Sequence, residues 1–133
     1  MEKILLVDNE PKFLAEMEQI VRNSKHNFNI EKASSCNEAK GKIANNDYSI
    51  IITDMAMEEE NSGLEILRVA KEKNIYTQII VVTNYEKPTL EIQAMAEGAF
   101  DFIKRGSNIY VRSLFEKFEE AIMYQRSKIG DKK

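Results

Sequence analysis

Residues 48–54 read Tyr-Ser-Ile-Ile-Ile-Thr-Asp, and they give the strongest indication of the fold class. Three consecutive isoleucines cannot alternate between a buried and an exposed face, so the run predicts a strand buried on both faces, as in a parallel sheet covered by helices. Burying a carboxylate is costly, so Asp54 should lie where this strand ends, at the open edge of the sheet. In open α/β sheets ligands bind at that edge. Alternatively, Asp54 simply caps a loop or a helix.

Further apolar runs along the chain have the same character, and amphipathic segments separate them. The capping pattern of residues 35–38 and the prolines Pro11 and Pro88 mark helix starts, and Gly98 marks a helix end. Strands are expected at residues 3–7, 28–30, 50–52, 78–83 and 100–103. Helices are expected over residues 10–24, 35–45, 63–70, 88–97 and 108–125, with Ile109, Val111, Leu114, Phe115, Phe118 and Ile122 facing inward in the last.

Alternating strands and helices predict an α/β fold, a doubly wound five-stranded parallel sheet with helices on both faces. The first and third strands are the most continuously apolar, so they should be central, which gives the flavodoxin-like order 2-1-3-4-5. One domain is expected over residues 1–127, followed by a charged, frayed tail at residues 128–133.

The composition is typical of a soluble globular domain, because 43% of the 133 residues are hydrophobic and 31% are charged. A net charge of −3 gives no basis for direct nucleic-acid binding. Cys36 is the single cysteine, which excludes an internal disulfide and fits a reduced, cytoplasmic setting. No signal peptide is expected, and no apolar run approaches the ~20 residues that span a membrane.

Polar residues end four of the expected strands, and carboxyl ends of parallel strands meet at one edge. Asp8 and Asp54 should therefore meet Thr83 and a cation, Lys104 or Arg105. Converging carboxylates repel one another unless a cation neutralises them, and all-oxygen donors suit Mg²⁺. A hydroxyl and a cation could hold two phosphoryl oxygens, and a carboxylate facing them could attack phosphorus and carry an acyl phosphate.

The chain resembles the receiver domain of two-component response regulators over residues 2–125. The resemblance rests on five motifs: residues 4–10 (ILLVDNE), 51–57 (IITDMAM), 63–67 (GLEIL), 80–83 (IVVT) and 98–103 (GAFDFI).

This resemblance implies that Asp54 is the phosphoacceptor, charged by a histidine kinase or a histidine phosphotransfer protein. Mg²⁺ would be bound by the side chains of Asp8 and Asp54 and by the backbone carbonyl of Ala56. An amide oxygen from Asn9 would replace the second acid that the family usually has. Tyr85, two residues past the switch hydroxyl, is expected to shield the phosphoryl group from water.

By the same resemblance, Thr83 is the switch hydroxyl, and Phe102 stands at the family's switch aromatic and would turn inward on phosphorylation. The output face would comprise residues 88–97, 100–103 and 108–125. It would bind a partner, an output domain missing from this chain, or a second copy in a homodimer. The chain would not be an enzyme beyond catalysing its own phosphorylation and dephosphorylation, and no membrane partner is expected.

Several residues depart from the family's pattern. Asn9 removes one negative charge, so Mg²⁺ binding should be weaker. Residues 58–60, three glutamates, replace the usual proline-containing loop, and we interpret them as a solvated loop, although they could restore part of the missing charge. The family's lysine is usually seven residues after the glycine of its Gly-Ala pair, which is Gly98 here. That count gives Arg105, whereas residue type favours Lys104.

Two other readings remain open. A pseudo-receiver, an interaction module that keeps the fold without being phosphorylated, is favoured by Asn9, Glu58 and Gly106. A flavodoxin-like FMN binder or hydrolase fits poorly, because a flavin phosphate needs a Ser/Thr/Gly-rich loop where this chain has acids after its first strand.

Overall fold

A computed structural model describes residues 2–84 and 87–132. Its parallel sheet has the order β2-β1-β3-β4-β5, which confirms the predicted fold class and strand order. The strands are β1 (Glu2–Val7), β2 (Phe28–Ala33), β3 (Ile50–Asp54), β4 (Gln78–Thr83) and β5 (Asp101–Lys104). The helices are α1 (Pro11–Arg22), α2 (Cys36–Asn45), α3 (Ser62–Lys73), α4 (Pro88–Ala96) and α5 (Tyr110–Lys132). No helix in these ranges is long and apolar enough to cross a membrane.

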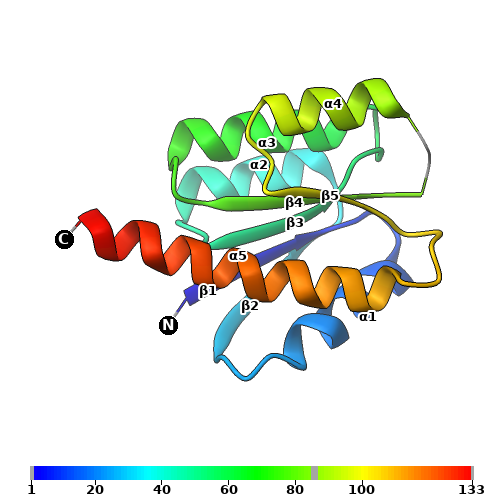
Figure 1. Ribbon diagram of the computed structural model, residues 1–133. Helices are drawn as coiled ribbons and strands as arrows, with labels where there is room; N and C mark the ends of the chain where they lie inside the picture. The colour runs from blue at the N-terminus through cyan, green and yellow to red at the C-terminus, as the bar shows by residue number, and fades with distance from the viewer. Residues whose placement is uncertain (1, 85–86, 133) are drawn as a thin grey trace.

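Helices cover the sheet on both faces, α2, α3 and α4 on one and α1 and α5 on the other (Figure 1). Because neighbouring residues of a strand point to opposite faces, each strand contributes to both cores. Ile51 packs with α2–α4, whereas Ile50 and Ile52 pack with α1 and α5. All three isoleucines are at most 1% exposed, as expected for a central parallel strand.

The strand register brings the polar ends of the strands together. Val7 is the partner of Thr53, so Asp8 follows β1 beside the end of β3. Asp54 is the partner of Val82, and Thr83 is the partner of Lys104. These pairings place the polar residues at one edge, as the sequence indicated.

Helix signals in the sequence act as expected. The Ser35 hydroxyl accepts a hydrogen bond of 3.0 Å from the Glu38 backbone N–H at the start of α2. The Glu38 carboxylate accepts a bond of 2.7 Å from the backbone N–H of Ser34. Gly98 has a φ of 103°, the left-handed conformation that ends α4.

Helix α5 differs from its prediction at both ends. It does not end near Gln125 but continues to Lys132, and the fraying expected for the charged tail over residues 128–133 stays a prediction. Packing explains the helix as far as Arg126, because Gln125 is buried, Arg126 forms an ion pair with Glu2, and the ring of Tyr124 lies 5.8 Å from that of Phe100. Neither proline nor a left-handed glycine interrupts these described turns.

The start of α5 is also rotated relative to the prediction. Ile109 and Val111 were expected to face inward, but they are 56% and 54% exposed. Tyr110 is buried instead, one helical turn before the buried Leu114. The rotation therefore directs a tyrosine toward the site edge.

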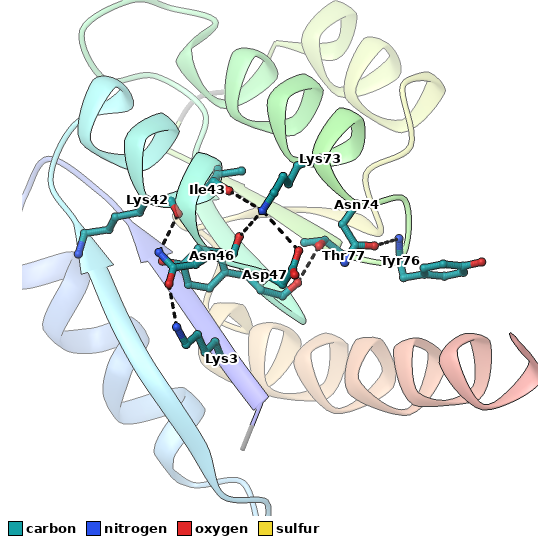
Figure 2. A network of polar contacts seen from close by, with 10 residues as sticks. Lys3, Lys42, Ile43, Asn46, Asp47, Lys73, Asn74, Tyr76 and Thr77 are labelled. Atoms are coloured by element: carbon teal, nitrogen blue, oxygen red, sulfur yellow. Dashed lines mark hydrogen bonds and ion pairs between the residues drawn. The ribbon is translucent and has the colours of Figure 1, made fainter. Parts of the chain in front are cut away.

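A polar network fastens the opposite edge of the sheet (Figure 2). The Lys73 ammonium donates to the carbonyl oxygens of Ile43 (3.3 Å), in the last turn of α2, and of Asn46 (3.0 Å), directly after α2. Lys3 of β1 donates to the Asn46 side-chain oxygen at 2.7 Å. This network joins α2, α3 and β1 at the edge away from Asp54.

Candidate functional site

Asp54 ends β3 as a buried carboxylate, 6% exposed. Burial first and the negative charge of Asp8 second raise the pKa of Asp54, which is about 6 instead of 3.8. The Arg105 charge and the backbone N–H groups of Ala56 and Met55 act in the opposite direction. Asp54 therefore carries a charge near neutral pH while it has few water contacts, which is a state suited to a nucleophile.

Asp8 is fully buried beside Asp54, and both of its oxygens accept hydrogen bonds. Oδ1 accepts from the backbone N–H of Glu10 at 2.9 Å. Oδ2 accepts from Nη2 of Arg105 at 2.9 Å, in an ion pair whose side chains are 5% and 0% exposed. Arg105 thus supplies a cation to the two-carboxylate site.

The backbone of Arg105 is fixed by β4, because its N–H donates to the carbonyl of Thr83 at 2.7 Å. Thr83 is itself buried at the end of β4. Lys104, the alternative cation, is exposed as the last residue of β5. Successive strand side chains point to opposite sides, so Arg105 rather than Lys104 is directed at the carboxylates.

Two aromatic residues that the sequence analysis did not assign to the site enclose Arg105. Its guanidinium carbon lies 4.0 Å from the ring centroid of Phe13 in α1 and 5.6 Å from that of Tyr110 in α5. Phe13 could have been suspected from its place in the first turn after Asp8. Tyr110 gives no such signal, since the apolar spacing of the sequence favours Ile109 and Val111 as the inward residues.

The loop after Asp54 closes tightly onto the start of α3. The Gly63 N–H donates to the carbonyl of Met55 at 2.7 Å. A Cβ at Gly63 would lie 2.8 Å from the Cα of Met55 and 2.9 Å from the carbonyl oxygen of Asp54. Glycine at this position therefore permits the backbone geometry on which the Asp54 side chain depends.

Other expected site residues lie at the rim or in the core. Asn9 is exposed directly after Asp8, and Ala56 is half-buried with its N–H near the Asp54 carboxylate. Phe102 is only 9% exposed and packs with the core under α2–α4, and its inward turn on phosphorylation stays a prediction. Tyr85 lies outside the described residues.

The acidic run after Asp54 is not simply a solvated loop. Both carboxylate oxygens of Glu58 accept from the backbone N–H of Cys36, at 2.9 and 3.1 Å, at the start of α2. Glu60 forms an ion pair with Lys87, next to α4. Glu58 stabilises the positive end of a helix dipole, so its charge is directed to α2 and does not replace the acid lost at Asn9.

The donor chemistry at this edge fits a magnesium ion. In the described part of the chain, no three or more His, Cys, Asp or Glu side chains form a metal-binding group. Mg²⁺ is typically bound by one or two carboxylates and keeps several waters, which matches the pair Asp8 and Asp54. Asn9 and the carbonyl of Ala56 supply further oxygen atoms close in the chain.

Comparisons with known proteins agree with this architecture. The family model of the response regulator receiver domain matches residues 4–110. The chain is 28% identical over 104 residues to the response regulator protein PilR of Pseudomonas aeruginosa, an alignment covering 78% of this chain and 23% of that protein. It is 26% identical over 102 residues to the photosynthetic apparatus regulatory protein RegA of Rhodobacter capsulatus, covering 77% and 54%. The chain thus spans about half, or less, of the length of these relatives.

Solved structures show the same fold. A CheY-like response regulator receiver domain protein from Methanospirillum hungatei JF-1 superposes with a TM-score of 0.83 at 24% identity, covering 96% of this chain and 98% of that one. A receiver domain protein from Clostridium thermocellum gives 0.80 at 27% identity, covering 97% and 98%. The family match covers most of the chain, and the chain therefore belongs to the response regulator receiver domain family of two-component signalling.

Proposed function

We propose that Asp54 accepts a phosphoryl group from a histidine kinase or a histidine phosphotransfer protein. The observation that carries the proposal is the buried constellation of Asp54, Asp8, Thr83 and Arg105 at the carboxyl edge of the sheet. An Asp54 oxygen would form a bond to phosphorus while the bond from phosphorus to the donor's imidazole nitrogen breaks, and the imidazole leaves with its electron pair and gains a proton.

Residues around Asp54 would orient the group. The Thr83 hydroxyl and the Arg105 guanidinium are the donors for phosphoryl oxygens, and Asp8, Asn9, Asp54 and the Ala56 carbonyl are the ligands for Mg²⁺. The ion, when bound, would offset the repulsion between carboxylate and phosphoryl oxygens. Receiver domains are in general not true enzymes, and we propose that this one promotes only its own phosphorylation and dephosphorylation, in the cytoplasm.

The output would pass through the face formed by α4, β5 and α5. Ile92 and Met95 of α4 are 69% and 43% exposed there, an apolar surface suited to a partner, an output domain or a second copy of the chain. Thr83 would couple the phosphoryl group to this face through the end of β4. Phe102 of β5 would turn inward on phosphorylation.

Intact mass after treatment with acetyl phosphate and Mg²⁺ tests the proposal. The wild type should gain one phosphoryl group, Asp54→Asn should not, and the control Asp47→Asn, an exposed acid at the opposite edge, should label like the wild type. Labelling of Asp54→Asn to the wild-type extent would contradict the assignment.

A second candidate is a pseudo-receiver that binds partners without phosphorylation. It is favoured by the Asp8–Arg105 ion pair and by the exposed amide of Asn9 in place of an acid. An unmodified wild-type mass with acetyl phosphate at saturating Mg²⁺ would support this candidate.

A further inference from the structure

The neutralising charge at the site comes from a side chain that is unusually constrained. Arg105 is 7% exposed, and its guanidinium lies between the rings of Phe13 and Tyr110 and ends on Asp8. These three partners come from three different elements, α1, α5 and the turn after β1. The contacts therefore form only in the folded chain and fix one orientation of the side chain.

Ring faces help to hold this orientation, beside the hydrogen bond to Asp8. Nε and Nη1 of Arg105 and the hydroxyl of Tyr110 are buried and have no hydrogen-bond partner among the described residues. A guanidinium carbon 4.0 Å from the Phe13 ring centroid is within the range of a favourable cation–π contact. Phe13 and Tyr110 thus stabilise an arginine position in which Nη2 alone makes a hydrogen bond, to Asp8.

Asp8 has no oxygen left unengaged in this state, because Oδ1 accepts from the Glu10 N–H and Oδ2 from Arg105. Each oxygen still has a second lone pair, but the guanidinium on Oδ2 places a positive charge beside the carboxylate, and this charge repels a divalent cation that approaches Asp8. The Glu10 N–H belongs to the backbone turn leading into α1, whereas Arg105 moves by side-chain rotation. The two aromatic rings oppose that rotation.

We propose that Phe13 and Tyr110 are positioning residues that hold Arg105 on Asp8, so that this arginine competes with a divalent cation for the carboxylate. The inference rests on the proposed magnesium site, and it assigns part of that site's metal affinity to residues that never touch the metal. Loss of either ring releases Arg105 and makes Asp8 more available, so Mg²⁺ binding becomes tighter although no charge changes.

Calorimetric titration of the unphosphorylated, full chain with magnesium chloride tests the proposal. Phe13→Leu should lower the dissociation constant about three- to tenfold, the range that one cation–π contact allows. Phe13→Tyr keeps a ring and should bind like the wild type. Tyr124→Leu is the matched control, because it removes a comparable contact, Lys128 at 5.3 Å from the Tyr124 centroid, far from the site.

The sign of the change separates positioning from a merely structural role. A site loosened by a core substitution binds the metal more weakly, whereas the proposal requires tighter binding. Phe13 is half-buried, so its leucine variant is expected to fold, and Tyr110→Leu provides a second, more buried position. Equal or weaker Mg²⁺ binding in folded Phe13→Leu would overturn the proposal.

Two further outcomes keep this inference distinct from the proposed function. Binding that is detectable only in Phe13→Leu supports the positioning role, and no binding in either protein overturns it together with the magnesium site. Mass gain with acetyl phosphate is measured on the same samples. A wild type that is phosphorylated but has the same metal affinity as Phe13→Leu overturns the positioning role and leaves Asp54 as the phosphoacceptor.

Discussion

Replacing Asp54 with asparagine should make the metal-free protein more stable at neutral pH. The side chain is 6% exposed, and burial first and the charge of Asp8 second raise its pKa from 3.8 to about 6. Folding therefore moves an ionised carboxylate into surroundings that disfavour its charge. An amide at the same place has a similar shape and carries no charge.

The sign and size of the effect follow from the two pKa values. Between 3.8 and about 6 the folded chain binds more protons than the unfolded chain, so the free energy of unfolding falls as pH rises through this window. A difference of about two pKa units corresponds to a loss of at most about 3 kcal/mol in the free energy of unfolding. This loss is present in full above the pH window and absent below it. The advantage of Asp54→Asn over the wild type should grow by that amount with pH.

Urea unfolding of both proteins in EDTA, at pH values from about 4 to about 8, measures the difference directly. The control Asp47→Asn removes an exposed acid, 74% accessible, at the opposite edge and should show no such pH-dependent gain. If Asp54→Asn is less stable than the wild type at the upper end of this pH range, or if the difference does not vary with pH, burial of the Asp54 charge does not destabilise the fold.

Three other substitutions probe the surroundings of the site. Gly63→Ala should lower the free energy of unfolding in urea by about 1–3 kcal/mol and reduce acetyl phosphate labelling, since its Cβ would lie 2.8 Å from Met55 Cα. The control Gly41→Ala, where a Cβ meets nothing within 4 Å, should lower neither stability nor labelling. Asn9→Asp should tighten Mg²⁺ binding roughly tenfold in calorimetry by adding a charge, and an unchanged constant would place residue 9 away from the metal. Glu58→Ala should lower the free energy of unfolding by about 1 kcal/mol, because the backbone N–H of Cys36 at the start of α2 loses its acceptor. Glu59→Ala should change the free energy of unfolding little. Equal effects of the two substitutions would count against the capping role of Glu58.

The strand positions and the site edge could be predicted from the sequence because both depend on local apolar runs. Ile50, Ile51 and Ile52 are hydrophobic on both sides of the strand, a pattern that only a sheet covered by two helix layers satisfies. The polar residue that follows each run then has to lie at the same edge. The meeting of Asp8 and Asp54 at this edge could therefore be predicted from the sequence without knowledge of any contact between them.

Contacts between distant residues could not be predicted in the same way. Glu58 accepts from Cys36, 22 residues away, and Arg105 pairs with Asp8, 97 residues away. Sequence spacing does not tell which surface glutamate reaches a helix start, since that depends on where α2 and the loop after β3 lie. The prediction of which residues of α5 face inward was wrong for a related reason. Tyr110 and its apolar neighbours differ by a rotation of one residue, and tertiary packing selects among them.

The two departures from the family's pattern at this site are linked by charge. Asp8 and Asp54 with Arg105 leave one uncompensated negative charge at the buried edge, and the Asp8 charge adds to burial in raising the pKa of Asp54. An acid at position 9 would add negative charge at the exposed rim of this edge, where water screens most of it. The larger contribution is that of Arg105, because its buried charge on Asp8 lowers the repulsion between the two carboxylates when no metal is bound. A receiver built in this way should keep its structure when the ion is removed and should need more Mg²⁺ before Asp54 becomes a good acceptor.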